Sequence, residues 1–235
     1  MTSVRDFQVQ SENLEETRAI TVFLPPGHRP GREYPTVFCA DGQAVHAFTP
    51  QLYHRMEHDA VPHVILVGVH SSEQYRAKEY INGGDNRRFL AHERFFTDEV
   101  YRWAVAEFAL PVAPRSCGVF GFSNGGAFAL SMGVRHRDKY GVVIAFSIAG
   151  GPDRVAESEY ARRPIARYYL SAGTREKPFL KTARALAAIL AKHGVEHVST
   201  EWCGGHDFRF WNLELSEAIR WAFPDPTIGI PLLSH

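Results

Sequence analysis

Short apolar runs alternate with longer segments of helical periodicity over most of the chain. Short runs rich in branched and aromatic side chains are typical of strands buried in a sheet. Apolar residues spaced three and four apart indicate amphipathic helices instead. From residue 36 onward the two patterns follow each other in turn, which predicts an α/β fold, a mostly parallel central sheet flanked by helices on both faces.

The pattern also predicts where the elements lie. Strands are expected at Phe7–Gln10, Thr17–Leu24, Thr36–Ala40, Val64–Val69, Cys117–Phe120, Val142–Ile148, Arg167–Leu170 and Val198–Trp202. Helices are expected at Phe48–His58, Glu93–Phe108, Ala127–Gly133, Phe179–His193 and Phe208–Phe223. Residues 73–93 form a long polar segment, which we expect to be a functional or disordered loop. Residues 153–164 are long enough for a minimal cap, and the absence of a linker predicts a single domain, 1–235.

In a sheet of this kind, reactive groups gather at the carboxyl ends of the strands. A set of polar residues and glycines follows the predicted strands directly: Asp41, Gly42, Gln43, His70, Ser123, Gly150, Gly151, Glu176 and His206. This set contains a nucleophile, an acid and an imidazole in the order Ser, Glu, His.

The serine lies in Gly121-Phe122-Ser123-Asn124-Gly125, a Gly-x-Ser-x-Gly motif between a predicted strand and a predicted helix. This context predicts a nucleophile elbow, in which the chain turns sharply and the serine adopts a strained backbone conformation. Glycines two residues before and after the serine leave room for the neighbouring chain. A strand-to-helix turn with a capping serine is the alternative interpretation.

A serine hydroxyl becomes a good nucleophile when a base takes its proton. His206 is the candidate base, because it follows the last strand and two glycines. Glu176 is the candidate acid that would orient the imidazole, although it could also be a helix-start acid. Asp207 and Asp153 are the second and third candidates for the acid.

An oxyanion formed on the substrate needs fixed N–H donors. We expect one from the backbone of Asn124, which starts the helix after the serine. A second is expected from the backbone of Gln43 or Gly42, in the loop after an early strand.

Composition narrows the class of protein. Lys and Arg number 26 and Asp and Glu number 26, so neither nucleic acid nor an anionic membrane is favoured as a partner. The three cysteines are widely spaced and match neither a disulfide framework nor a zinc site. With no recognisable signal sequence and no apolar run long enough to span a bilayer, we expect a cytoplasmic protein.

Three stretches together resemble the esterase D and enterochelin-esterase branch of the α/β-hydrolases, called the putative esterase family. They are Gly121–Gly126, Ala172-Gly173-Thr174-Arg175-Glu176-Lys177-Pro178, and Gly204-Gly205-His206-Asp207 with Trp211 behind. The resemblance implies a cofactor-independent serine hydrolase of carboxylic esters, with a small-molecule ester as its partner. It implies Ser123 as nucleophile, His206 as base and an oxyanion hole near Gly42 and Gln43. Formyl-thioester, feruloyl, siderophore and simple acyl esters all fit.

The polar segment before the helix at Glu93 is not explained by a triad. We expect Arg76, Arg87 or His92 to line a pocket for the acyl or alcohol group of the substrate. The charges at Glu93 and Arg94 could equally be ordinary helix-start charges.

Three alternative functions are also compatible with the sequence. An acyltransferase would use the same acyl-enzyme with another acceptor, and a non-catalytic binding protein on this fold would have a broken triad. A metal-dependent hydrolase is suggested formally by His-x-x-Glu-His at His54–His58 and His193–His197. We interpret both as surface histidines and expect no metal site. The motif needs one continuous helix, which Gly194 is expected to end in the second match, and the first match lies at the end of a short polar helix, far from the strand ends that carry the other candidates. The apolar tail Pro224–His235 leaves open a homo-oligomer or packing on its own domain.

Overall fold

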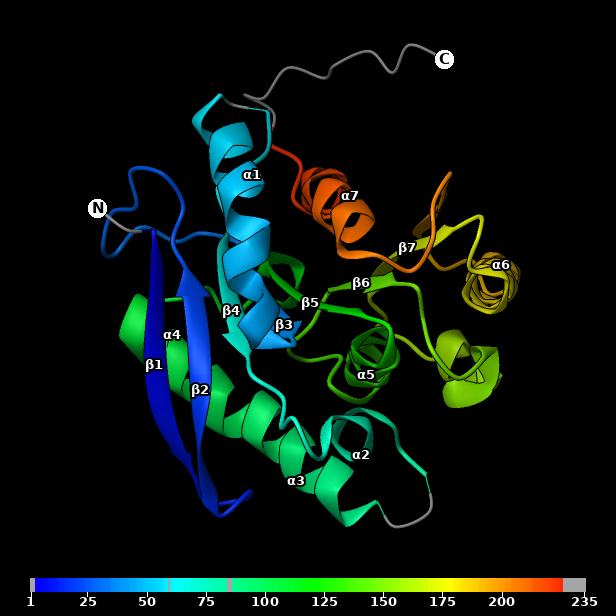
Figure 1. Cartoon of the computed structure of the whole chain (residues 1–235), viewed down its shortest axis with the longest axis horizontal. Coiled ribbons are helices and arrows are strands. Elements are labelled where there is room, and N and C mark those ends of the chain that lie inside the picture. Colours follow the sequence, from blue (N-terminus) through cyan, green and yellow to red (C-terminus); the bar gives the residue numbers. More distant parts are fainter. Residues whose placement is uncertain (1–2, 59, 84–85, 226–235) are drawn as a thin grey trace.

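The computed structural model describes residues 3–58, 60–83 and 86–225 of the chain. Eight strands form one sheet in the order β1-β2-β4-β3-β5-β6-β7-β8 (Figure 1). Their bounds are β1 Val4–Ser11, β2 Glu16–Phe23, β3 Thr36–Ala40, β4 Ile65–Val69, β5 Cys117–Phe122, β6 Val142–Phe146, β7 Arg167–Gly173 and β8 His197–Trp202. β1 pairs antiparallel with β2, and β2 pairs antiparallel with β4. All other pairs are parallel, so the predicted α/β class is confirmed.

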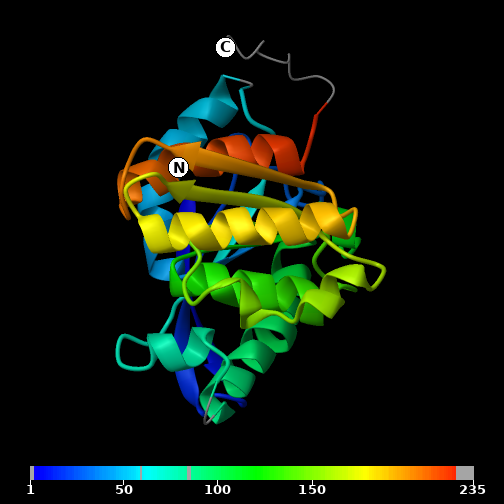
Figure 2. The ribbon, with the colours of Figure 1, turned by 90° about the vertical axis from the view of Figure 1, so that its right-hand side faces the viewer.

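Helices cover both faces of this sheet (Figures 1 and 2). Their bounds are α1 Val45–Glu57, α2 Arg76–Tyr80, α3 Arg87–Arg94, α4 Tyr101–Phe108, α5 Asn124–Arg135, α6 Lys177–Lys192 and α7 Phe208–Ala222. α1 and α7 pack on one face, and α3, α4, α5 and α6 pack on the other. Successive side chains of a strand point to opposite faces. Phe38 and Ala40 of β3 therefore join the core under α5, whereas Val37 and Cys39 join the core under α1 and α7.

The segment 73–93 differs from its prediction as a loop. It contains α2 and most of α3, and α3 continues through a π-helical stretch, Phe95–Val100, into α4. The helix expected from Glu93 therefore starts at Arg87. The polar sequence of residues 73–93 favours a loop. In the structure, however, Glu79 of α2 is fully buried, and its charge is balanced by Arg18 and Arg88 of neighbouring elements.

The segment 153–164 forms two short 3₁₀ turns, Pro152–Arg154 and Glu157–Ala161. Tyr160 of the second turn is buried and packs its ring against Tyr168 of β7 at 5.8 Å. This contact attaches the segment to the body of the protein. The tail expected to pack on a neighbour or on its own domain lies, from residue 226 on, outside the described residues. Among the helices that the structure describes, none combines the length and apolar character needed to cross a bilayer.

Candidate active site

Ser123 lies at the sharp turn between β5 and α5. Its backbone has φ 56° and ψ −124°, a conformation that L-residues seldom adopt and that sequence context had predicted as strained. Two hydrogen bonds hold the turn: Ser123 N–H donates to Phe146 O at 3.0 Å, and Ala149 N–H donates to Ser123 O at 3.1 Å. The serine is thus fixed to the end of the neighbouring strand β6.

Close contacts surround the two glycines of the motif, with the main chain at Gly121 and with side chains at Gly125. A Cβ at Gly121 would lie 2.1 Å from the carbonyl oxygen of Gly125. A Cβ at Gly125 would lie 3.0 Å from Oδ2 of Asp41 and 3.2 Å from Ala40 Cβ. The turn after β5 therefore packs directly against the end of β3, where the oxyanion loop was expected.

A hollow of about 390 Å³ lies over the turn. Its lining combines a hydroxyl, an imidazole, an ion pair and an aromatic wall: Asp41, Gln43, Ala44, Arg76, Phe122, Ser123, His206, Phe208 and Trp211. The segment 153–164 contributes no residue to this lining. The structure thus brings Ser123, His206, Gln43 and Arg76 together around one space.

His206 and Glu176 are directly bonded. His206 Nδ1 lies 2.6 Å from Glu176 Oε2, and the glutamate side chain is 3% exposed against 33% for the histidine. The other oxygen, Oε1, accepts hydrogen bonds from the backbone N–H of Gly173 and from Ser147 Oγ, each at 2.6 Å. Glu176 also directly precedes α6, as expected for a helix-start acid. Its side chain nevertheless contacts the histidine, as expected for the acid that orients the imidazole.

Aromatic rings enclose the imidazole on two sides. Phe179 of α6 stacks on it with ring centroids 4.4 Å apart, and Trp211 of α7 meets it edge-on at 4.8 Å. Trp211 itself stacks on Phe122, the residue before the serine, at 4.3 Å. The ring plane of His206 is therefore set by its neighbours as well as by Glu176.

The loop after β3 begins at Asp41, whose φ of 55° is also in the left-handed region. Its buried carboxylate is held by Arg76, with Nε to Oδ1 at 2.6 Å and Nη2 to Oδ2 at 2.7 Å. Its backbone N–H donates to the hydroxyl of Tyr80 at 2.7 Å. Two residues of α2 therefore fix the backbone that leads into Gly42 and Gln43.

The same loop is held from the other side by β4. A Cβ at Gly42 would lie 2.2 Å from the carbonyl oxygen of Gly68, so only glycine fits there. The side chain of Gln43 exchanges hydrogen bonds with Ser71: its Nε2 donates to Oγ at 2.9 Å, and its Oε1 accepts from the Ser71 N–H at 3.2 Å. Gln43 lies in the short 3₁₀ turn Gly42–Ala44, and Asn124 is the first residue of α5. In the first turn of a helix, a backbone N–H has no carbonyl of a preceding turn to bind.

The three residues expected to contact substrate are separated in the structure. Arg76 lines the hollow and is 29% exposed. Arg87 is at the exposed start of α3 and does not line the hollow. His92 is fully buried among Tyr80, Phe96 and Phe128, away from the hollow lining. Periodicity could have indicated this for His92, which falls three and four residues before two buried phenylalanines, Phe95 and Phe96.

The other candidates for the acid or for metal ligands lie elsewhere. Asp207 caps α7 by accepting from the Phe210 N–H at 3.1 Å, and Asp153 lies in a 3₁₀ turn. His54 and His58 are at the end of α1, with ring centroids 4.3 Å apart. α6 ends at Lys192, so His193 and His197 do not share a helix. Within the described residues, no cluster of three or more His, Cys, Asp or Glu is arranged to hold a metal ion.

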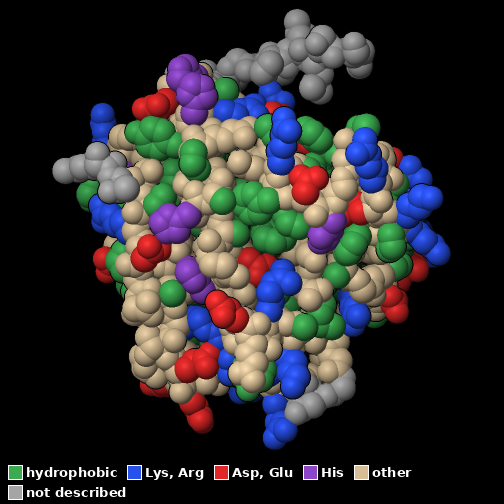
Figure 3. Space-filling model, in the orientation of Figure 1, with side chains coloured by type: hydrophobic (Ala, Val, Ile, Leu, Met, Phe, Trp, Pro, Cys, Tyr) green, Lys and Arg blue, Asp and Glu red, His purple; other side chains and the backbone are tan. Residues whose placement is uncertain are grey.

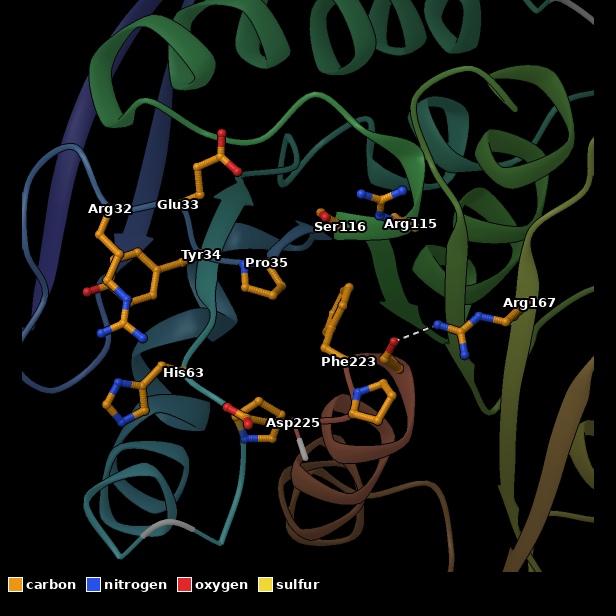
Figure 4. Close-up of a pocket in the computed structure, with 13 residues that line it drawn as sticks. Arg32, Glu33, Tyr34, Pro35, His63, Arg115, Ser116, Arg167, Phe223 and Asp225 are labelled. Atoms are coloured by element: carbon orange, nitrogen blue, oxygen red, sulfur yellow. Dashed lines mark hydrogen bonds between the residues drawn. The ribbon is translucent and has the colours of Figure 1, made fainter. Parts of the chain in front are cut away.

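A larger hollow, about 760 Å³, lies at the opposite edge of the sheet (Figure 4). Its lining residues precede β3, β4 and β5, begin β7, or lie at the end of α7 and just beyond it, and they include Arg32, Arg115 and Arg167. Arg167 Nη2 donates to the carbonyl oxygen of Ala222 at 2.6 Å.

On the face of the molecule in Figure 3, basic and acidic side chains are interspersed.

Ser147 is a buried side chain bonded to Glu176 that the sequence did not single out. It follows β6 with φ 46°, and its hydroxyl accepts from Trp211 Nε1 at 2.9 Å. A serine after an apolar strand carries no distinctive pattern, so only its place at a strand end could have indicated it.

Comparison with known proteins gives a consistent result. A family model described as putative esterase matches residues 11–222. The acetyl esterase of Caldicellulosiruptor saccharolyticus is 24% identical over 198 residues, which cover 65% of this chain and 74% of that protein.

Two solved structures show the same fold. The enterobactin esterase of Shigella flexneri aligns with a TM-score of 0.80 and 22% identity, over 93% of this chain. This chain spans 58% of the length of that protein. The BES protein of Bacillus cereus aligns with a TM-score of 0.81 and 16% identity, over 94% of this chain and 95% of its own.

Proposed function

Because this chain belongs to the putative esterase family, we propose that it hydrolyses a carboxylic ester through Ser123, His206 and Glu176. Family membership and the acetyl esterase relative support ester hydrolysis. The observation that carries the assignment of residues is the 2.6 Å contact between His206 Nδ1 and Glu176 Oε2, beside a serine at a strained turn in the same hollow.

In the first half-reaction, Ser123 Oγ attacks the ester carbonyl while His206 Nε2 takes its proton. Glu176 keeps the Nδ1 proton on the histidine and stabilises the imidazolium. The tetrahedral intermediate collapses when the imidazolium returns the proton to the alcohol oxygen, which leaves as the free alcohol. The acyl group stays on Ser123.

In the second half-reaction, water attacks the acyl-enzyme and gives its proton to His206. The imidazolium then protonates Ser123 Oγ as the acyl–oxygen bond breaks and the carboxylic acid leaves. An alcohol in place of water would give acyl transfer by the same steps. His206 lines the hollow with its side chain 33% exposed, so water can reach the acyl-enzyme.

The oxyanion of both intermediates would be bound by backbone N–H groups of Asn124 and of Gln43 or Gly42. The start of α5 adds the positive end of a helix dipole at this point. Asp41, Arg76 and Tyr80 support this role, because they fix the loop that carries the second donor.

Arg76 would also border the bound ester. Its guanidinium uses Nε–H and one Nη2–H on Asp41, so further N–H groups remain for an acceptor on the substrate. Arg76→Lys keeps the positive charge but loses the bidentate interaction with Asp41. We therefore expect an increase in KM together with a fall in kcat. A change in neither would remove Arg76 from the site.

The proposed mechanism is tested by hydrolysis of a short-chain aryl acetate. Ser123→Ala and His206→Ala should each lower kcat by at least about a thousandfold. Asp207→Asn is the matched control for Glu176→Gln: the first alters a helix cap and should leave kcat within about threefold, while the second should lower it by about 100-fold or more. Full activity of Ser123→Ala would disprove the mechanism.

If the wild type does not hydrolyse aryl acetates, a fluorophosphonate probe separates two explanations. Covalent labelling of Ser123 would show an assembled site with a different substrate. Failure of labelling in a folded protein would show that Ser123 is not an activated nucleophile. Activity that is unchanged by a chelator agrees with the proposal, and loss of activity would favour the metal-dependent alternative.

A further inference from the structure

Two buried glutamates near the carboxyl ends of β6, β7 and β8 are held by similar groups. Glu176 Oε1 accepts from Ser147 Oγ, which in turn accepts from Trp211 Nε1. Glu214 Oε1 accepts from Ser171 Oγ at 3.1 Å, and its Oε2 accepts from Trp202 Nε1 at 2.8 Å. The two serines are themselves neighbours, because Ser147 N–H donates to Ser171 O at 2.8 Å.

The two carboxylates differ in what their second oxygen does. Both oxygens of Glu214 accept hydrogen bonds from side chains of the sheet: Oε1 from Tyr169 and Ser171, and Oε2 from Trp202. Among the described residues, such donors bind Glu176 at Oε1 alone, and Oε2 meets Nδ1 of His206. Donors fixed on Oε1 set the plane of the carboxylate, so Oε2 is directed at the imidazole.

The backbone of Ser147 indicates that its side chain has a specific role. Five non-glycine residues of the described chain have positive φ, and three of them, Asp41, Ser123 and Ser147, directly follow β3, β5 and β6. Glycine adopts such a conformation at lower cost. The hydroxyl is what glycine would lack, and it is fully buried between Trp211 and Glu176.

Trp211 acts on the same histidine by a second contact. Its indole N–H donates to Ser147, and its ring meets the imidazole edge-on at 4.8 Å with an interplanar angle of 89°. The indole also stacks on Phe122 beside the serine. One side chain of α7 therefore touches the ring of the base and the hydroxyl that holds the acid.

We propose that Ser147 and Trp211 are positioning residues, which fix the orientation of His206 through the Glu176 carboxylate. This inference rests on the proposed function of the Ser123 site. Ser147 itself is fully buried and is not part of the hollow lining, so it acts through Glu176 and not on the substrate.

The test compares Ser147→Ala with Ser171→Ala, which removes an equally buried hydroxyl from the neighbouring carboxylate. We expect Ser147→Ala to lower kcat by about 10- to 100-fold with KM within about threefold, because misaligned groups lose rate more than binding. Ser171→Ala should leave kcat within about threefold. Equal losses of kcat in the two variants would overturn the proposal.

A double variant separates positioning from stability. In Ser147→Ala the indole N–H of Trp211 loses its buried acceptor, which destabilises the fold. Adding Trp211→Phe removes that donor, so the denaturant midpoint should recover while kcat stays at or below that of Ser147→Ala. Recovery of kcat together with stability would show a structural role and overturn the proposal.

A readout that needs no turnover distinguishes this inference from the proposed function. The proton between His206 Nδ1 and Glu176 should give a low-field NMR signal, assigned by its loss in His206→Ala. The signal should move in Ser147→Ala and stay in place in Ser171→Ala, and an unmoved signal overturns the inference. If Ser147→Ala fails to fold, Ser147→Gly removes the hydroxyl and tolerates the positive φ. Full activity of Ser123→Ala, by contrast, would overturn the proposed function alone.

Discussion

At the scale of single residues, space for the main chain decides what can stand around Ser123. Gly121 and Gly42 are each packed against a backbone carbonyl, where a methyl group has no room. A different situation holds at Asp41, Ser123 and Ser147. Each has a backbone with positive φ, which glycine would adopt more easily, yet each carries a polar side chain. Small residues and strained ones therefore occur together at the ends of β3, β5 and β6.

Gly121→Ala tests this requirement. Its Cβ would lie 2.1 Å from a main-chain oxygen that cannot move without displacing the turn, so we expect the free energy of unfolding to fall by about 3 kcal/mol or more. Gly118→Ala, on the same strand, meets Phe223 Cζ at 3.5 Å and should change stability by less than about 1 kcal/mol. Urea unfolding of both variants makes the comparison, and similar midpoints would contradict the argument.

At the scale of elements, α2 joins the oxyanion loop to the β1–β2 hairpin. Its first and last residues, Arg76 and Tyr80, bind Asp41, and the side chain of Glu79 is also buried. Arg18 of β2 donates to both oxygens of Glu79, at 3.1 and 2.8 Å. Burial raises the pKa of this carboxyl, but the bonds from Arg18 and the charges around it outweigh burial and bring the pKa down to about 2.

His92 of α3 lies beside this ion pair, with Nδ1 3.7 Å from Glu79 Oε2. Neither ring nitrogen has a hydrogen-bond partner among the described residues. Burial lowers the pKa of His92 to about 4, from an ordinary value of 6.5, against the opposing pull of the Glu79 carboxylate. The folded protein therefore favours the neutral imidazole.

This predicts a pH dependence of stability. The unfolded chain binds a proton on this histidine below about pH 6.5, while the folded protein does so only below about pH 4. Stability from His92 is therefore present above pH 6.5 and is lost as the pH falls toward 4, by up to about 3 kcal/mol. His92→Leu should flatten the curve in this range, as measured by urea unfolding at a series of pH values.

The pH range below 4 serves as the control for this prediction. The Glu79 carboxylate stabilises the fold above about pH 4.5, and its contribution disappears only as the pH falls toward 2. The slope below pH 4 should therefore remain in His92→Leu, displaced to somewhat higher pH, because the charge of His92 also helps to lower the Glu79 pKa. An unchanged slope between pH 6.5 and 4 would show that another group is responsible.

At the scale of the whole molecule, the sheet brings together residues that are far apart in sequence. Parallel strands end at one edge, so loops from residues 41, 123, 176 and 206 meet there. α7 fastens this arrangement, because Trp211 and Glu214, one turn apart, bind groups from β6, β7 and β8. The closing helix therefore stabilises the end of the sheet that carries the proposed base.

Glu214→Leu should weaken this attachment. The carboxylate is 4% exposed and accepts from four side chains of the sheet, Tyr169, Ser171, Thr200 and Trp202, which would lose a buried partner. We expect the free energy of unfolding to fall by about 3 kcal/mol or more. Glu217→Ala on the same helix removes partly exposed ion pairs to Arg55 and Arg220 and should cost less than about 1 kcal/mol. Equal losses would contradict this account.

Local sequence pattern is enough to predict the order of elements and the candidate site residues. Apolar periodicity is local, so the core strands and the helices after them could be predicted closely, β3 to the residue. The turn at Ser123 depends only on residues close in sequence, including Gly121 and Gly125, so it could be predicted. In any parallel sheet the carboxyl ends of the strands lie at the same edge. Ser123, His206 and Glu176 could be chosen as candidates for that reason.

Which side chains meet depends on contacts between distant parts of the chain. Glu176 and Asp207 were both candidates for the acid, and the packing of β7 beside β8 put Glu176 against the imidazole. Glu79 and His92 are polar in sequence but buried in the fold, because Arg18 from another element compensates the carboxylate. Ser147 gains its contact with Glu176 from a strained backbone at the end of β6. Such contacts join distant parts of the chain, and local pattern contains no information about them.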